Sequence, residues 1–353
     1  MLAAVTERPL VPDRDRTAMP VGEYLDLQVE LLREAHDRGD RLAYRVMHAT
    51  VDRKATPEEL LASPLTLEVA REAIARDHRY ADWASAQSHA DDVLDAGFEA
   101  ACDAIEWGEV GALRALLDAR PELVRDRSPF PHHAMLLHHV AANGIEVERQ
   151  LQSPPNAAEI ARLLLERGAD PNAVCDAYGG RDTTLTLVVS SSHPARAGVQ
   201  GPLVEELCRG GALVNGLDDD GAPLFAAINS GYTTAAEALV RCGARVDNLV
   251  FAAVDGRLDE VQSYFDADGE LALDRAWGTL LDGPAGSRLE RDRPLEYALI
   301  WAALHGRREV VEFLLTKQPD LSFTEPFHHV TARGAAGHGR HTEIVALLDA
   351  YSG

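Results

Sequence analysis

The amino-acid sequence predicts an all-α fold, in which a small helical N-terminal cap is followed by a solenoid of repeated helix–turn–helix units. Three observations predict it. A glycine-containing phrase recurs three times, each copy directly after an amphipathic helix. A shorter, alanine-rich helix recurs upstream of that phrase, and residues 21–95 do not follow the repeat. Self-similarity at a spacing of tens of residues is the sequence signature of a repeat array.

The recurring phrase reads GADPN at 168–172, GALVN at 211–215 and GARVD at 243–247. The helix before its first copy includes EIARLLL at 159–165, with apolar residues at helical spacing. Each glycine falls at the end of such a helix, where a left-handed backbone conformation is common. We therefore expect Gly168, Gly211 and Gly243 to end helices.

The shorter helix reads LHHVAANG at 137–144, PLFAAINSG at 223–231 and LIWAALHG at 299–306. Together the two patterns resemble the ankyrin repeat, which runs T-P-L-H-x-A-A-x-x-G, then a second helix, then G-A-D-x-N. The run from His138 to Gln200 resembles more closely a subfamily of bacterial ankyrin proteins. That resemblance implies a fold and a bacterial origin but no reaction.

The chain divides into a flexible N-terminus at 1–20, the helical cap at 21–95 and about seven ankyrin units at 96–353. Apolar residues predict three helices in the cap, near 25–32, 65–74 and 80–93. The stretch 65–83 resembles a helical leader that precedes the repeats of many bacterial ankyrin proteins. Its expected role is to cover the exposed apolar face of the first repeat.

Three insertions depart from the regular unit of about 33 residues. The segments 145–156 and 193–202 occupy the same place in consecutive units, so we expect them to be neighbours in space. The third, 266–293, contains Trp277 and either folds over the groove or forms a mobile loop. Loops of a repeat array often carry its binding specificity, which makes these insertions the informative feature.

Composition excludes several classes of partner. The chain has 57 acidic and 34 basic residues and a formal net charge of −23, which repels nucleic-acid phosphates and anionic lipid. No apolar run approaches the roughly 20 residues of a membrane-spanning helix. The N-terminus lacks the apolar run of a signal peptide, and the four cysteines are widely separated without CxxC spacing. These features predict an acidic cytoplasmic protein with reduced thiols.

The register of the repeats predicts an inner, concave face with an apolar stripe and a polar edge. His139, Leu187, Ala226, Phe251 and Trp301 form the stripe. A floor of this kind suits either a small molecule or a partner's peptide. The residues that we expect to contact a ligand or partner are Asn143, Asp176, Tyr178, Ser191, Asn229, Phe251 and Trp301.

Titratable groups concentrate at one end of this face. His139 or His193 beside Glu146 and Arg149 could handle protons near neutral pH, so these four are the catalytic candidates. His138 occupies the histidine position of the repeat, where a hydrogen bond to the backbone is expected. Neither HExxH, zinc-finger spacing nor a phosphate-binding glycine loop occurs, so no metal and no cofactor are predicted.

Two functions follow, and whether the protein is an enzyme stays open. The first is an ankyrin-repeat binding protein whose concave face holds an intracellular protein partner, which rests on fold analogy. The alternative is a cofactor-free enzyme of isomerase, cyclase, lyase or hydrolase type, with a pocket formed by repeats two to four and their inserted loops. A deep pocket lined by His139, Asn143, Arg149 and His193 would favour the enzyme, and an open groove would favour the binding protein.

Overall fold

The computed structural model describes residues 19–281 and 284–351. Most of the predicted flexible N-terminus, residues 1–18, therefore lies outside the described residues. The described chain is helical apart from one short hairpin, in which β1 (Val174–Cys175) pairs antiparallel with β2 (Asp182–Thr183). The predicted all-α class is confirmed. Among the described helices, none is both long and apolar enough to cross a membrane.

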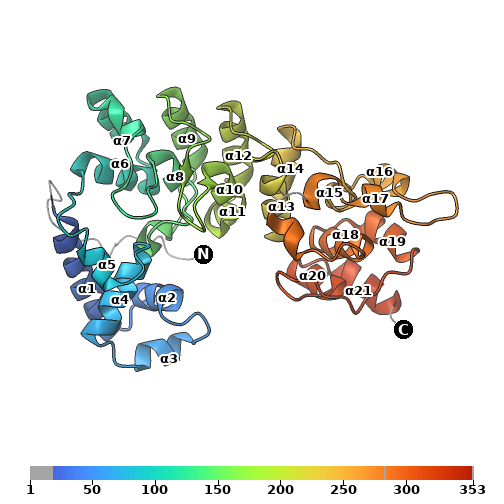
Figure 1. The fold of residues 1–353 in the computed structure, drawn as a ribbon, viewed down its shortest axis with the longest axis horizontal. Coiled ribbons are helices and arrows are strands. Elements are labelled where there is room, and N and C mark those ends of the chain that lie inside the picture. The colour runs from blue at the N-terminus through green and yellow to red at the C-terminus, as the bar shows by residue number, and fades with distance from the viewer. Residues whose placement is uncertain (1–18, 282–283, 352–353) are drawn as a thin grey trace. The chain divides into compact units, whose positions relative to one another are not determined.

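The chain forms two compact units, residues 1–199 (unit 1) and 200–353 (unit 2), which Figure 1 shows in blue to green and in yellow-green to red. The helices of unit 1 are α1 (Val21–Asp37), α2 (Arg41–Thr50), α3 (Pro57–Ala62), α4 (Leu67–Asp77), α5 (Trp83–Gln87), α6 (Ala96–Trp107), α7 (Val110–Ala119), η1 (Pro121–Val124), α8 (Leu136–His139), η2 (Val147–Gln150), α9 (Ala157–Glu166), α10 (Thr184–Val189) and α11 (Ser192–Ala197).

The N-terminal helices of unit 1 surround one apolar core. Helix α1 packs against α2 and α4, and α2 packs against α3 and α4. Sequence analysis predicted three helices here and missed α2 and α3. Both carry recognisable start signals: Asp40 caps α2, and Thr56 and Glu59 form a capping box around Pro57 at the start of α3.

The core of these N-terminal helices extends into the second repeat. Phe130 is buried in it, and Val147 and Leu151 from the first insertion pack against it. The inserted segment is therefore held between the N-terminal helices and the repeats of unit 1.

Helix pairs follow in unit 1. Helix α6 contacts α7 and α8, α8 contacts α9 and α10, and α7 contacts α9. The first helices of successive repeats thus lie beside one another, as do the second helices (Figure 1). The glycines that we expected to end helices have the left-handed backbone conformation. The angle φ is +90° at Gly168 and +97° at both Gly211 and Gly243.

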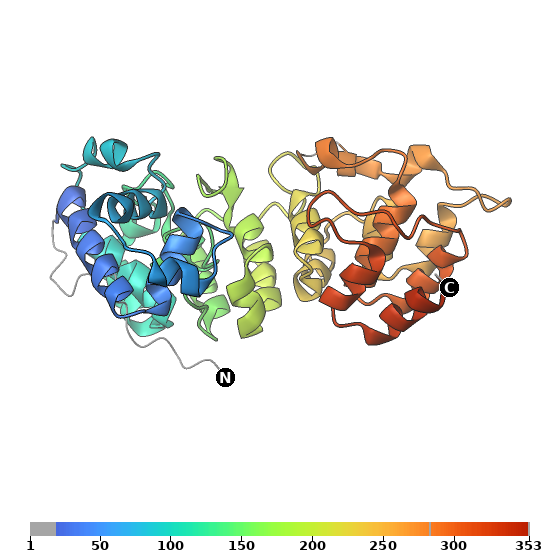
Figure 2. The same ribbon diagram turned by 90° about the horizontal axis from the view of Figure 1, so that it is seen from below.

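The helices of unit 2 are α12 (Gln200–Arg209), α13 (Ala222–Asn229), α14 (Thr233–Arg241), α15 (Leu249–Asp255), α16 (Leu258–Ser263), α17 (Leu273–Ala276), η3 (Gly278–Leu281), η4 (Pro284–Arg288), α18 (Pro294–Leu304), α19 (Arg308–Leu315), α20 (Ala332–His338) and α21 (Thr342–Tyr351). Helix α18 packs between α15 and α20, while α19 contacts α16 and α21. Figure 2 shows this unit from below.

The described part of the third insertion, 266–281 and 284–293, packs into unit 2. Its short helices contact α13 and α15. Trp277 is buried, its indole N–H donates to the Arg291 carbonyl at 2.8 Å, and its ring meets Tyr297 of α18 edge-on. These residues belong to the aromatic core of unit 2.

Candidate functional site

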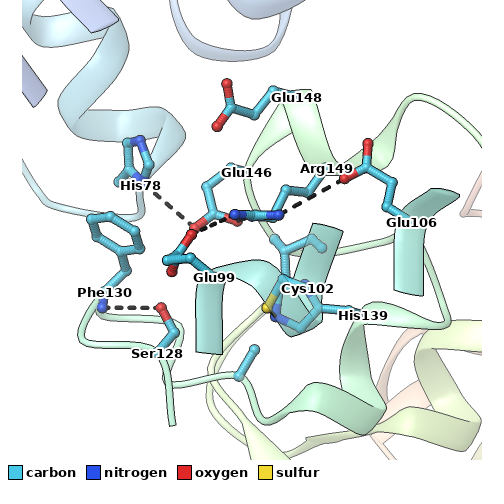
Figure 3. A network of polar contacts seen from close by, with 12 residues as sticks. His78, Glu99, Cys102, Glu106, Ser128, Phe130, His139, Glu146, Glu148 and Arg149 are labelled. Carbon is cyan, nitrogen blue, oxygen red and sulfur yellow. Dashed lines mark hydrogen bonds and ion pairs between the residues drawn. The ribbon is translucent and has the colours of Figure 1, made fainter. Parts of the chain in front are cut away.

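Three of the four catalytic candidates come together inside unit 1. Glu146, Arg149 and His139 are 2%, 4% and 7% exposed. They lie where the first insertion meets α6 and α8, as Figure 3 shows. The fourth candidate, His193, lies apart from them at the start of α11 and is half-buried.

Arg149 is the centre of this buried network. Its guanidinium donates to Glu99 at 2.5 Å and to Asp103 at 3.0 Å, and lies 3.9 Å from Glu106. The three carboxylates share one face of α6 because they are four and three residues apart. Burial disfavours the charged guanidinium, but the surrounding carboxylates hold the pKa of Arg149 well above its ordinary value.

Glu146 is the second centre. The Nδ1 atom of His132 accepts the Ala134 N–H at 3.0 Å, so its Nε2 carries the proton that is donated to Glu146, also at 3.0 Å. His78 Nδ1 lies 3.6 Å from the same carboxylate. Burial alone would raise the pKa of Glu146. The imidazoles of His132 and His78 have the larger, opposite effect, so the pKa of Glu146 lies well below its ordinary value.

The N-terminal helices supply the other side of the network. Tyr24 and Gln28 of α1 each donate to Glu148 at 3.0 Å. Asp77, the last residue of α4, accepts the Val147 N–H at 3.1 Å. Burial raises the pKa of Asp77 to about 7 and also raises that of Glu148. The first insertion is thus fastened to the N-terminal helices by buried polar groups.

Cys102 and His139 form a pair that sequence analysis did not anticipate. The Cys102 Sγ lies 3.5 Å from His139 Nε2, and both side chains are buried. Burial raises the pKa of the Cys102 thiol and lowers that of the His139 imidazole well below its ordinary value. Both groups are therefore neutral near pH 7, and a thiolate nucleophile is not formed here.

The repeat register predicted that His139 would lie on an open groove, but the structure shows it buried. Its ring faces Cys102 and meets Phe98 of α6 edge-on, because α6 packs directly on α8. His138 has the predicted structural role: its Nδ1 accepts the Met135 N–H, and its Nε2 donates to the Ala173 carbonyl.

A small cavity of about 10 Å³ lies beside His139, Arg149 and Ser153. That volume suits about one water molecule, whereas small-molecule sites typically measure about 300 Å³ or more. Within the described residues no group of three or more His, Cys, Asp or Glu side chains could hold a metal ion. The network can therefore orient the inserted segment, but it leaves no room there for a metabolite.

A second group of predicted residues includes an exposed tyrosine of unit 1. Tyr178, in the turn between β1 and β2, is 60% exposed, and its hydroxyl donates to Asn143 at 2.6 Å. The Asn143 amide donates in turn to the Leu187 carbonyl at 3.0 Å. The Asp176 side chain is exposed nearby in sequence, while Ser191 is buried and caps α11.

The predicted contact residues of unit 2 are covered by the chain itself. Phe251 and Trp301 are 1% exposed. Trp301 stacks on Tyr297 with ring centroids 5.3 Å apart and also meets Phe225 edge-on. The carbonyl of the half-buried Asn229 accepts a hydrogen bond from His328 at 3.0 Å. Periodicity placed these side chains on an open inner face and could not predict the segments that cover them.

No protein-family model matches the chain, and no curated protein matches it either. Among solved structures, it is similar to the ankyrin repeat domain of Bcl-3, a member of the IkappaB protein family, with 18% identity over 71% of this chain and 97% of that one and a TM-score of 0.36. It is also similar to the human ASB11 ankyrin repeat domain, with 19% identity, coverage of 70% and 96%, and a TM-score of 0.37. TM-scores and sequence identities this low carry no argument about the site. The ankyrin-like description rests on the recurring sequence pattern and the helix pairs.

Proposed function

We propose that the protein is an ankyrin-repeat binding protein that holds an intracellular protein partner on the exposed surface around Tyr178 in unit 1. The observation that carries the proposal is an exposed aromatic side chain held in one position. The Tyr178 hydroxyl is fixed by Asn143, and the Arg79 guanidinium lies 5.4 Å from the centre of its ring. Tyrosine and arginine are the side chains most enriched where partners contribute binding energy.

The backbone below Tyr178 is also fixed. Asp182 accepts the Tyr178 N–H at 2.7 Å, which closes the turn between β1 and β2. Gly144 has φ of +80°, and a Cβ atom there would lie 2.4 Å from Ala177 Cβ. The turn therefore needs a glycine beneath it. A surface that is ordered before binding loses less conformational entropy when a partner arrives.

The geometry does not favour the enzyme alternative. His139, Glu146 and Arg149 are buried in ion pairs and hydrogen bonds, and the adjacent cavity has the size of about one water molecule. A general base must lie within hydrogen-bonding reach of a substrate proton, and these groups face protein atoms instead.

A capture experiment tests the proposal. The immobilised full chain is incubated with a bacterial lysate, and retained proteins and small molecules are measured separately by mass spectrometry. Tyr178→Ala is compared with Tyr351→Ala, which removes a partly exposed tyrosine from α21 of unit 2. We expect a protein that is retained by the wild type and by Tyr351→Ala, and at least about tenfold less by Tyr178→Ala.

Unfolding curves of both variants serve as the folding control. Retention of a metabolite without a protein would contradict the proposal, as would equal retention of every captured protein by Tyr178→Ala and the wild type.

A further inference from the structure

Three arginines and a histidine lie on α2 and α11 of unit 1, and one of the arginines contacts the first insertion. Arg41 and Arg45 are four residues apart on α2, and His193 and Arg196 are three apart on α11, so each pair shares a helix face. The Arg45 guanidinium donates to the Gln150 carbonyl in η2 at 3.1 Å. We call Arg41, Arg45, His193 and Arg196 the arginine cluster.

The arginine cluster lacks anionic partners. Within the described residues, no ion pair joins Arg41, Arg45 or Arg196 to a carboxylate, although the chain has 57 acidic residues. Burial, then Arg196 and then Arg41 lower the pKa of Arg45. Seven other described arginines have a raised pKa instead, with acidic neighbours among the causes.

The charges of Arg45 and Arg196 also affect the pKa of His193. Burial, then Arg45 and Arg196 lower the pKa of its imidazole to about 4, so the ring is neutral near pH 7. Like charges held close together raise the free energy of the unbound protein. An anionic group placed among them would remove that repulsion and gain charge-assisted hydrogen bonds.

The arginine cluster is continuous with the surface around Tyr178. The Gln150 backbone accepts from Arg45, and its side-chain oxygen accepts the Gly144 N–H at 3.2 Å. A Cβ atom at Gly144 would lie 3.3 Å from Cε2 of the Tyr178 ring. Arg79, whose guanidinium lies 5.4 Å from the centre of that ring, has a buried Nε atom with no hydrogen-bond partner among the described residues. The exposed aromatic ring therefore has Arg79 beside it and is linked to Arg45 through Gly144 and Gln150.

We propose that the occupant of this surface is an acidic, extended segment of the protein partner, with its carboxylates at the arginine cluster and at Arg79. This inference rests on the function proposed above and names the chemistry of the partner. Carboxylates match the fork of a guanidinium, and the groups to be reached are spread over α2, η2, α11 and the turn at Tyr178. A segment with several carboxylates reaches such a spread surface, whereas one small anion fills a single point of it.

The net charge of the chain makes the test selective. A protein with a net charge of −23 repels acidic peptides in general. Binding of such a peptide therefore requires a local site, and it must weaken as salt screens the charges.

The experiment measures the fluorescence anisotropy of two labelled peptides mixed with the full chain. The peptides are identical except that one has glutamate at alternate positions and the other has glutamine. We expect the glutamate peptide alone to bind, and more weakly in salt of about 0.15 M than of about 0.01 M. Arg45→Glu combined with Arg196→Glu should weaken binding at least about tenfold. Arg45→Gln with Arg196→Gln repeats the test without adding negative charge, in case the first variant unfolds.

The control is Arg114→Glu, which reverses one charge at an exposed arginine on α7 of unit 1. We expect it to bind the glutamate peptide as the wild type does. Equal binding by all variants, or no binding of the glutamate peptide to the wild type, would overturn the inference. So would binding of inorganic tripolyphosphate through the same arginines when the glutamate peptide does not bind, because the site would then serve a small phosphorylated ligand.

The capture experiment separates this inference from the proposed function. If a partner depends on Tyr178 but is retained fully by the Arg45 and Arg196 variants, the acidic-segment inference fails and the proposed function stands. If the wild type retains no partner, the proposed function fails.

Discussion

The two units hold their inserted segments by opposite means. In unit 1 the first insertion enters the interior through charged groups, with Glu146 and Arg149 at the centre of the network. In unit 2 the third insertion enters through an aromatic ring, Trp277, which packs against Tyr297 and is buried. The same structural task, fastening extra chain to a stack of helix pairs, is solved by ion pairs in one unit and by aromatic packing in the other.

The difference has physical consequences. Buried ions are costly to remove from water, and that cost is offset only when each charge meets its partner. A charged attachment therefore fixes one arrangement of the segment and makes it sensitive to pH. Aromatic packing depends on contact area and is insensitive to pH. This contrast agrees with the proposal that unit 1 presents a binding surface held in one shape.

The largest expected effect is the loss of Arg149. Arg149→Ala leaves Glu99, Asp103 and Glu146 near one another without their shared cation. We expect the free energy of unfolding to fall by about 3–5 kcal/mol, measured by urea denaturation. Hydrogen exchange should show lost protection in residues 145–151 and α6 and little change in α18. Arg114→Ala, at an exposed position on α7, serves as the control. A loss under about 1 kcal/mol would show that the network does not stabilise unit 1.

A change in the aromatic core of unit 2 is Trp301→Leu on α18. It removes a ring that is 1% exposed and packs on Tyr297, Phe225 and Phe327. We expect a loss of about 2–3 kcal/mol, less than for truncation to alanine because leucine refills part of the space. The loss should be the same at pH 5 and pH 8, since no charge is involved. A loss that changes strongly between these two values would contradict the contrast between the units.

Local patterns in the sequence were sufficient for the ends of the repeat helices, although they missed α2 and α3. The glycines at 168, 211 and 243 are left-handed as predicted, and His138 makes the expected backbone hydrogen bonds. These features depend on residues close together in the chain, where register and spacing carry the information.

The partners within the charged network could not be predicted in this way. Tyr24 reaches Glu148 across 124 positions of sequence, and no local pattern links them. One signal was available: Glu99, Asp103 and Glu106 share one face of α6, among apolar neighbours. A helix face with three carboxylates beside a packed core predicts a buried cation opposite. In unit 2, periodicity predicted that Phe251 and Trp301 would contact a ligand or partner, but both are buried, and the segments that cover them follow only from the tertiary structure.

The smallest of the three stability effects concerns pH and Asp77. Burial raises the pKa of Asp77 from about 3.8 to about 7, so the folded protein binds a proton more tightly than the unfolded chain. Stability is therefore highest below the unfolded value and falls as pH rises toward 7, where the buried carboxyl ionises. Asp77→Asn removes this penalty and keeps an oxygen that can accept the Val147 N–H. We expect the variant to gain about 1–3 kcal/mol relative to wild type between pH 5 and pH 8.

Urea denaturation at a series of pH values measures this gain, with Asp91→Asn as the control at an exposed aspartate. The pKa of His78 is also raised by neighbouring carboxylates despite its burial, so its contribution falls with rising pH in both proteins. The difference in free energy of unfolding between Asp77→Asn and wild type therefore reports the ionisation of Asp77, together with the effect of Asp77 on His78.

If that difference stays constant from pH 5 to pH 8, Asp77 ionises freely and α4 does not hold the first insertion through a protonated carboxyl. If it grows as expected, the attachment of the insertion loosens on the alkaline side, and the surface around Tyr178 should lose hydrogen-exchange protection in wild type before it does so in Asp77→Asn.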